Sequence, residues 1–229
     1  MIEAVVFDLD GVLLDSEQVW DAVREQLTRE RGGRWHENAQ REMMGMSSLE
    51  WSRYMHDTLG LPEPPEEISA EVVRRLEERY RNQLPLLEGA REAVERLAAR
   101  WPLGLASSSN RELIDLVLDA SGLARFFPVT VSSEEVPRGK PAPDVYLEAA
   151  RRLEVAPESC AAVEDSSNGI RSAKAAGMRV IAIPNPHFPP DEECLALADV
   201  TLDSLVELTP ATVAGDGTGG GDAGTPSAA

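Results

Sequence analysis

Two acidic side chains, two positions apart, follow the first apolar run of the chain. Asp8 and Asp10 come directly after residues 2–7, a β-branched and aromatic run that predicts a buried strand. Alternate side chains of an extended chain point to the same side, and Gly11 then allows the backbone to turn away. Two close carboxylates repel each other and require a cation, a shared proton or solvent. The pair is therefore a candidate for acid–base or metal-dependent chemistry.

Polar side chains also follow two later apolar runs, residues 103–106 and 160–163. These side chains are Ser107, Ser108, Ser109 and Asn110 after the first run, and Glu164 and Asp165 after the second. Lys140 lies in a Gly-Lys-Pro turn between the two runs, and only two of the 22 basic residues are lysines. Ligands of open parallel sheets bind at the carboxyl ends of the strands. One sheet would therefore bring all these groups into one crevice.

Apolar runs and helical periodicity alternate along most of the chain. Strands are expected at 2–7, 103–106, 129–131, 160–163, 180–183 and 200–202, and helices at 90–100, 111–120, 143–154 and directly after 166. Near-continuous apolar strands between helices predict a parallel sheet covered on both faces. Residues 16–88 instead predict helices alone, at about 17–31, 37–44, 48–59 and 66–84, with Ser16 as the first N-cap.

The predicted fold class is therefore α/β, a Rossmann-like parallel sheet core with an all-helical domain inserted after the first strand. The core is expected to comprise residues 1–15 and 89–212, and the helical insertion residues 16–88. Residues 213–229 are rich in Gly, Ala, Thr and Ser without periodicity, and we expect this tail to be disordered.

Composition argues against several classes of partner. The formal net charge is −18, whereas nucleic acids and anionic membranes bind basic patches. The sequence has neither an apolar run of about 18 residues nor a basic leader, so neither a transmembrane helix nor a signal peptide is expected. Cys160 and Cys194 are too few for a disulfide framework. A cytoplasmic monomer that binds neither nucleic acid nor membranes is the expectation.

Carboxylates at the ends of separate strands favour a hard, oxygen-seeking cation. Mg²⁺ takes few protein carboxylates and bridges to a substrate phosphate. The three histidines, His36, His56 and His187, are scattered and form no zinc pattern. A lysine, serine hydroxyls and N–H groups at a helix start are suitable donors to phosphate oxygens. Each motif alone is more often part of a turn, a helix cap or a surface lysine, but together they indicate phosphoryl transfer.

These motifs, in this order, resemble the haloacid dehalogenase (HAD) superfamily, in the branch with a helical cap inserted after the first strand. The resemblance covers residues 1 to about 210. The run Asp8-Leu9-Asp10-Gly11-Val12 corresponds to the first motif. The second, third and fourth motifs correspond to Ser107, Lys140 and the pair Glu164-Asp165.

The resemblance implies a role for each member of the set. Asp8 would be the nucleophile that forms an aspartyl-phosphate, and Asp10 the general acid and then the base. Mg²⁺ would be held by the Asp8 carboxylate, the Asp10 backbone carbonyl and Asp165. Glu164 would bind the metal directly or support its ligands. The phosphoryl oxygens would be held by the two remaining members, Ser107 and Lys140.

Asp10 also selects among reactions, because transport ATPases of the superfamily have Thr there and dehalogenases lack the aspartate. Within the capped branch, the chain resembles small sugar or polyol phosphatases, such as 2-deoxyglucose-6-phosphatase and hexitol phosphatase, and also β-phosphoglucomutase. The mutase carries His in place of Trp20 and Arg in place of Ser48, although Arg75 could substitute for that arginine. The cap has no lysine, which excludes a Schiff-base phosphonatase.

The resulting expectation is a Mg²⁺-dependent phosphatase for small sugar- or polyol-phosphate monoesters. A hexose phosphomutase and a non-catalytic module that binds a phosphorylated metabolite are the alternatives. The cap is expected to close over the core, exclude water and select the leaving group. Trp20 would line the cap–core interface or lie in the core of the cap. The expected substrate contacts are Trp20, Ser108, Ser109 and Asn110.

Overall fold

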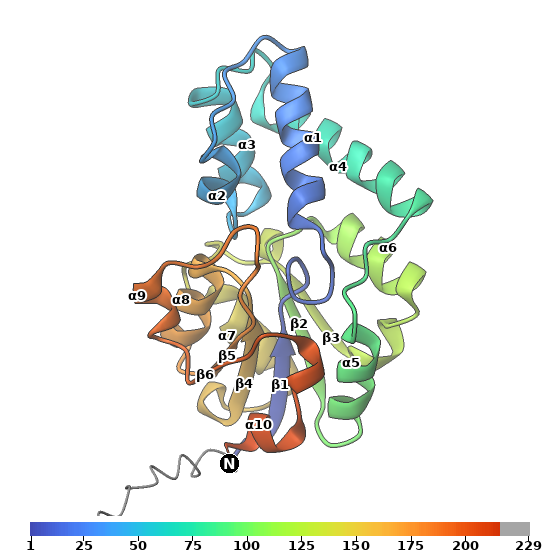
Figure 1. Ribbon diagram of the computed structural model, residues 1–229, viewed down its shortest axis with the longest axis vertical. Helices are drawn as coiled ribbons and strands as arrows, with labels where there is room; N and C mark the ends of the chain where they lie inside the picture. The colour runs from blue at the N-terminus through green and yellow to red at the C-terminus, as the bar shows by residue number, and fades with distance from the viewer. Residues whose placement is uncertain (216–229) are drawn as a thin grey trace, which may run out of the picture.

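A computed structural model describes residues 1–215 of the protein (Figure 1). Its sheet is parallel throughout, with the order β3-β2-β1-β4-β5-β6. The strands are β1 (Ala4–Phe7), β2 (Leu103–Ser107), β3 (Val129–Ser132), β4 (Cys160–Glu164), β5 (Arg179–Ala182) and β6 (Val200–Thr201). The chain continues from β1 to one side of the sheet and later returns to the other side at β4. The carboxyl ends of β1 and β4 therefore flank the switch point where such sheets bind ligands.

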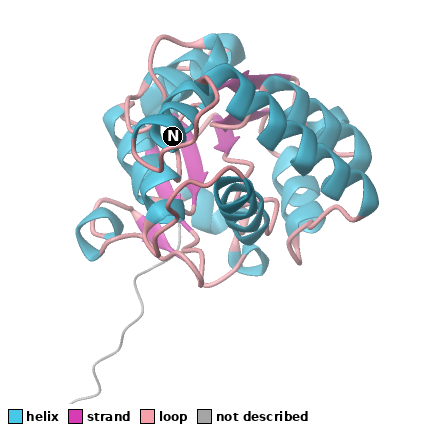
Figure 2. Ribbon diagram, turned by 90° about the horizontal axis from the view of Figure 1, so that it is seen from above, coloured by secondary structure: helices cyan, strands magenta, loops and turns pink. Residues whose placement is uncertain are grey.

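Helices cover both faces of this sheet, as Figure 2 shows from above. The longer ones are α5 (Ala90–Ala98), α6 (Arg111–Ser121), α7 (Asp144–Leu153) and α8 (Ser167–Ala175). Val5 and Phe7 of β1 pack in a cluster with α5 and α6, and Ala4 and Val6 pack in a second cluster with α7 and α8. The strands are therefore apolar on both faces, which confirms the predicted class of sheet.

Four helices between β1 and β2 form a helical layer beyond the carboxyl ends of the strands, in the upper half of Figure 1. They are α1 (Glu17–Glu30), α2 (Ala39–Met43), α3 (Ser48–Asp57) and α4 (Pro65–Asn82). Helix α4 buries every fourth residue from Ile68 to Tyr80, the stripe visible in the sequence. The boundaries of a separate cap at residues 16–88 stay a prediction.

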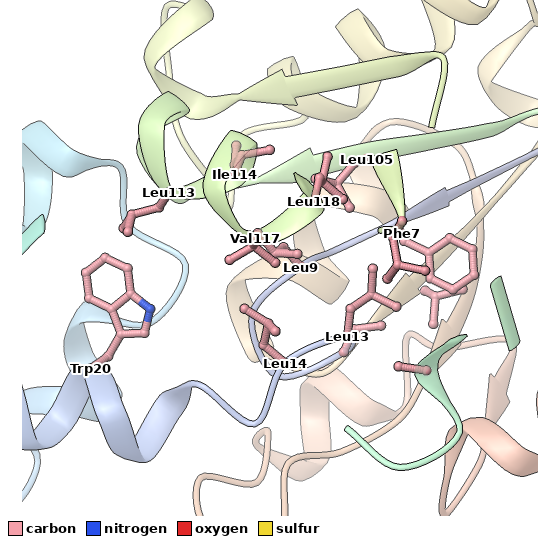
Figure 3. Packing of buried hydrophobic residues seen from close by; sticks show 14 of the residues in the cluster. Phe7, Leu9, Leu13, Leu14, Trp20, Leu105, Leu113, Ile114, Val117 and Leu118 are labelled. Atoms are coloured by element: carbon pink, nitrogen blue, oxygen red, sulfur yellow. The ribbon is translucent and has the colours of Figure 1, made fainter. Parts of the chain in front are cut away.

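One apolar cluster continues from the sheet into the helical layer. Figure 3 shows Leu9 and Leu14 packed beside α6, with Trp20 of α1 close to Leu113. Trp20 is 5% exposed, and its ring centre lies 5.9 Å from that of Trp51 in α3. The helical layer is thus attached to the core by buried apolar contacts as well as by chain connections.

The smaller elements show where the sequence prediction was incomplete. They are η1 (Ala124–Phe126), η2 (Ser133–Glu135), η3 (Pro157–Ser159), η4 (Leu205–Glu207), α9 (Glu192–Leu195) and α10 (Pro210–Ala214). The predicted tail therefore begins inside α10, while residues 216–229 lie outside the described part of the chain. No helix within residues 1–215 is long and apolar enough to cross a membrane.

Candidate active site

The carboxyl ends of β1 and β4 place two carboxylates side by side, and Lys140, in the loop before α7, lies between them. Phe7 is paired with Val163, so Asp8 and Glu164 leave neighbouring strands at the same level. Nζ of Lys140 lies 2.9 Å from Oδ1 of Asp8 and donates to Oε1 of Glu164 at 2.6 Å. All three side chains are buried. Residues that are far apart in sequence thus meet at the predicted edge of the sheet.

Glu164 is surrounded by donors on both carboxylate oxygens. The hydroxyl of Tyr146, on α7, donates to Oε1 at 2.7 Å. The backbone N–H of Asp165 and the hydroxyl of Ser166 donate to Oε2 at 3.1 and 3.3 Å. A Cβ at Gly169 would lie 1.9 Å from this same oxygen. Only glycine therefore fits at this third position of α8. Glu164 consequently holds Lys140 in place between itself and Asp8.

Asp8, Glu164 and Asp165 have carboxylate oxygens within 4.8 Å of one another. Oδ2 of Asp165 is buried and accepts no hydrogen bond within the described residues, while Oδ1 of Asp8 has the ammonium group of Lys140 beside it. The chain passes very close to Asp165, because a Cβ on Gly11 would lie 1.8 Å from Oδ2. Clustered carboxylate oxygens without donors are suitable ligands for a hard divalent cation. Asp8 and Asp165 have an oxygen available for it, whereas Glu164 already accepts several hydrogen bonds.

Burial and mutual repulsion perturb these groups strongly. Burial raises the pKa of Asp8 well above its usual value; Glu164 and Asp10 add to the shift, and Lys140 opposes it. Burial and the neighbouring carboxylates likewise raise the pKa of Asp165. For Lys140, burial alone would lower the pKa, but the charges of Asp8 and Glu164 raise it above its usual value. Lys140 therefore stays cationic, and additional positive charge would favour ionised Asp8 and Asp165.

Asp10 is oriented by donors from both parts of the molecule. Its Oδ1 accepts hydrogen bonds from the Ser16 hydroxyl at 2.6 Å and from Nε1 of Trp20 at 3.0 Å. Its Oδ2 accepts a hydrogen bond from the Ser109 hydroxyl at 2.6 Å. Ser16 occupies the expected N-cap position of α1, but its side chain makes no capping hydrogen bond and binds Asp10 instead. Asp10 thus links α1 to the loop after β2.

A polar cavity of about 40 Å³ lies between the helical layer and the strand ends. Its walls combine Asp8, Asp10 and Asp165 of the core with side chains of the helical layer, among them Glu17, Trp20, Arg24 and Trp51. A larger cavity of about 540 Å³ lies between α3, α4 and α6. None of Asp8, Asp10, Lys140 and Asp165 lines that larger cavity, so the smaller one is the candidate active site.

The serines after β2 have separate partners. Ser107 is buried, and its oxygen accepts the N–H of Ser109 at 3.0 Å, which leaves its own O–H free to donate. Ser108 lines the small cavity and donates to the backbone carbonyl of Gly45 in the helical layer at 2.8 Å. Asn110 instead lines the larger cavity. Its substrate contact, like those of Trp20, Ser108 and Ser109, stays a prediction.

Ser48 and Arg75, the two positions considered for binding a second phosphate of a mutase substrate, contact other side chains of the protein. Ser48 donates to Oε1 of Glu134 in the core at 2.8 Å, and Asn110 donates to the same oxygen at 2.7 Å. Arg75 lies 2.6 Å from Glu30 and 2.7 Å from Glu71, and it does not line the cavity of Asp8. The expectation that Arg75 could replace the missing arginine is therefore not supported by its position.

Sequence reasoning missed a group of buried polar residues in the helical layer. Glu17, Trp20 and Arg24 are spaced three and four apart, so they lie on one face of α1. Burial, with the charge of Asp10, raises the pKa of Glu17 to about 7. Burial lowers the pKa of Arg24 to about 10, against the opposing charges of Glu17 and Asp10. The i, i+3, i+7 spacing is the available signal, but polar residues of an amphipathic helix usually lie on its solvent-exposed face.

Comparison with known proteins places the chain in a family. Residues 2–177 match the family described as a hydrolase, haloacid dehalogenase-like hydrolase. The chain belongs to the haloacid dehalogenase-like hydrolases. It is 36% identical over 227 residues to hexitol phosphatase B of Escherichia coli (strain K12), covering 91% of this chain and 95% of that protein.

Two further relatives agree with this assignment. The phosphorylated carbohydrates phosphatase of Thermotoga maritima is 32% identical over 182 residues, covering 79% of this chain and 84% of that protein. The crystal structure of CbbY from Rhodobacter sphaeroides in complex with phosphate superposes with a TM-score of 0.82 at 29% identity, covering 93% and 100% of the two chains. The prediction of a HAD-type phosphomonoesterase is confirmed by the family and its phosphatase relatives.

Proposed function

We propose that the protein hydrolyses phosphate monoesters of small sugars or polyols through a phosphorylated Asp8. The observation that carries this proposal is the arrangement of two carboxylates. Asp8 is buried beside the cationic Lys140, while Asp10 is held by hydrogen bonds from Ser16, Trp20 and Ser109. Two carboxylates in such different surroundings are suited to different roles, one as nucleophile and the other as acid and base.

The reaction then has two steps. A carboxylate oxygen of Asp8 attacks phosphorus, the bond to the ester oxygen breaks, and Asp10 gives its proton to the leaving alcohol. Asp10 then takes a proton from water, whose oxygen attacks phosphorus and releases inorganic phosphate and free Asp8. In both steps the phosphoryl oxygens carry negative charge, which Lys140 and the free hydroxyl proton of Ser107 stabilise.

A divalent metal fits the same site, and we assign Mg²⁺ on the chemistry of its ligands. Asp8 and Asp165 would hold it with their clustered carboxylate oxygens, together with the backbone carbonyl of Asp10. When bound, Mg²⁺ neutralises negative charge on the phosphoryl group. The positive charge also offsets the repulsion among the buried carboxylates.

The relatives and the cavity both support this substrate class. The names of two relatives refer to hexitols and to phosphorylated carbohydrates. The cavity of about 40 Å³ holds only a few water-sized groups, since one water requires about 10–15 Å³. The substrate therefore enters with the helical layer displaced from the strand ends, and the layer then closes over it. Neither position considered for binding a second phosphate supports a phosphomutase. Ser48 donates a hydrogen bond to Glu134, and Arg75 forms an ion pair with Glu30.

The decisive experiment replaces the nucleophile with its isostere. Asp8→Asn should lower Mg²⁺-dependent phosphate release by about 10³-fold or more, because an amide does not attack phosphorus. Asp15→Asn is the matched control, since Asp15 is exposed and should keep the parent activity. The assay covers sugar, polyol and nucleoside monophosphates, with EDTA as the metal-free condition. Full activity of a folded Asp8→Asn variant would overturn the proposal.

A further inference from the structure

Three polar side chains of the helical layer form a buried cluster that the reaction at Asp8 does not use. Glu17, Arg24 and Gln40 are 7%, 4% and 1% exposed. Nε2 of Gln40 donates to Oε2 of Glu17 at 2.8 Å, and Nη1 of Arg24 donates to Oε1 of Gln40 at 3.0 Å. Replacing such buried charged groups with apolar residues often leaves a protein equally stable or more stable. Stability alone is therefore a weak explanation for the cluster.

Arg24 is held rigidly but is not fully satisfied. Its guanidinium carbon lies 4.3 Å from the ring centre of Trp20 and 4.7 Å from that of Trp51. Its Nε is buried and has no hydrogen-bond acceptor within residues 1–215. A buried donor without a partner is costly and rare in native proteins. Because Arg24 lines the same cavity as Asp8, its guanidinium group is placed to donate to an oxygen atom of a bound ligand.

Glu17 offers the complementary group beside it. Its Oε2 accepts from Gln40, while Oε1 accepts no hydrogen bond from the described residues. The cavity is therefore lined by Glu17, which has a free carboxylate oxygen, and by Arg24, next to Trp20 and Trp51. A hydroxyl group both donates and accepts, and adjacent hydroxyls suit such an acceptor–donor pair. The charges of Glu17 and Arg24 offset each other, which suits an uncharged ligand.

Given the proposed phosphomonoesterase activity, we propose that Glu17 and Arg24 form a subsite for adjacent hydroxyl groups on the carbon chain of the substrate. Glu17 accepts a hydrogen bond from one hydroxyl, and Arg24 donates to a neighbouring hydroxyl oxygen. A second phosphate or a carboxylate at this subsite meets the carboxylates of Glu17 and Asp10 in a poorly solvated cavity, where like charges repel strongly. The substrate class is thus a monophosphate with an uncharged, hydroxyl-bearing chain.

The test compares a substrate with hydroxyls and one without. Glucitol 6-phosphate and phenyl phosphate are assayed with Mg²⁺ for the parent, Glu17→Gln and Arg24→Lys. The ratio of kcat/KM for the two substrates should fall by about 10- to 100-fold in each variant, chiefly through the KM of glucitol 6-phosphate. Glu25→Gln, on the same helix but in a surface ion pair with Arg29, should keep the parent ratio. Circular dichroism checks that each variant is folded. If one of the two variants does not fold, the other alone is enough for the comparison.

The outcomes separate this inference from the proposed function. An unchanged ratio in a folded Glu17→Gln or Arg24→Lys variant, with phenyl phosphate still hydrolysed, overturns the subsite and leaves the phosphatase activity intact. A parent enzyme that prefers fructose 1,6-bisphosphate or 3-phosphoglycerate to glucitol 6-phosphate also overturns it, and this comparison needs no variant. A parent enzyme that hydrolyses none of these esters overturns the proposed function, and the subsite with it.

Discussion

The hydroxyl of Tyr146 contributes a hydrogen bond to the most highly charged part of the molecule. It donates to Glu164, which in turn holds the ammonium group of Lys140. Tyr146→Phe removes this donor and keeps the ring, so the free energy of unfolding should fall by about 1.5–3 kcal/mol, as for hydrogen bonds to charged groups. Urea unfolding measures the change. Tyr80→Phe is the control, because the buried hydroxyl of Tyr80 has no partner within the described residues, so its loss should not lower the free energy of unfolding. Equal effects of the two substitutions would contradict this assignment.

The raised pKa of Glu17 makes stability depend on pH. The pKa is about 7 in the folded protein against an ordinary value of 4.5, so between these values the folded state binds more protons than the unfolded one. Stability from this group is complete below pH 4.5 and is lost as the pH rises through 7. The loss is of order 3 kcal/mol at 1.36 kcal/mol per pKa unit.

Glu17→Gln should remove this dependence, because an amide does not ionise. With the metal removed by EDTA, the Tm of the variant relative to the parent should rise between pH 5 and pH 7.5 and then level off. Thermal unfolding at a series of pH values measures it. Glu25→Gln, whose side chain is in a surface ion pair, should show no such trend. A Tm difference that stays constant with pH would show that Glu17 does not carry the effect.

At the scale of elements, α1 connects the helical layer to the reacting groups. Nε1 of Trp20 donates to Asp10, so the position of the helix and the orientation of the acid–base group depend on each other. Trp20→Phe should lower kcat for phenyl phosphate by about 10-fold, within the range for misplaced general acids and bases. Trp101→Phe also removes an indole hydrogen bond, to the carbonyl of Ile2, but away from the cavity. It should reduce stability without lowering kcat, and a similar loss of kcat in both variants would contradict the role of Trp20.

The sequence predicts elements well where local chemistry determines their ends. Helix α4 begins at Pro65, one residue before its expected start, and α1 and α6 lie within one residue of their expected limits. Asp8 and Glu164 lie at the carboxyl ends of β1 and β4, as the apolar runs before them predict. The order of strands is different: the neighbours of β1 are β2 and β4, and no local pattern specifies that pairing.

The buried cluster of Glu17, Arg24 and Gln40 marks the limit of such prediction. Each residue type is normally exposed, and the three are buried only because α1, α2 and α3 pack together over the strand ends. The hydrogen bond from Tyr146 to Glu164 could not be predicted for the opposite reason. An aromatic residue on a buried helix face is usually explained by packing alone. Both kinds of residue depend on tertiary contacts that periodicity does not encode.

At the scale of the whole molecule, a formal charge of −18 opposes the approach of an anionic substrate. The buried ion pairs around Lys140 act over about 3 Å and are little affected by salt, whereas repulsion between exposed charges and an incoming phosphate is long-ranged. The Debye length falls from about 30 Å at 0.01 M salt to about 8 Å at 0.15 M. Salt should therefore change the encounter with the substrate more than the chemical step.

Raising NaCl from 10 to 150 mM at fixed Mg²⁺ should accordingly increase kcat/KM for a monophosphate several-fold, through a lower KM and with kcat nearly constant. Steady-state kinetics on phenyl phosphate measure both constants. Inhibition by inorganic phosphate, another anion, should strengthen in parallel, which separates screening from an effect on the carbon chain of the substrate. A KM that rises with salt would mean that local positive charge, from Lys140 and the metal, outweighs the global field even at a distance.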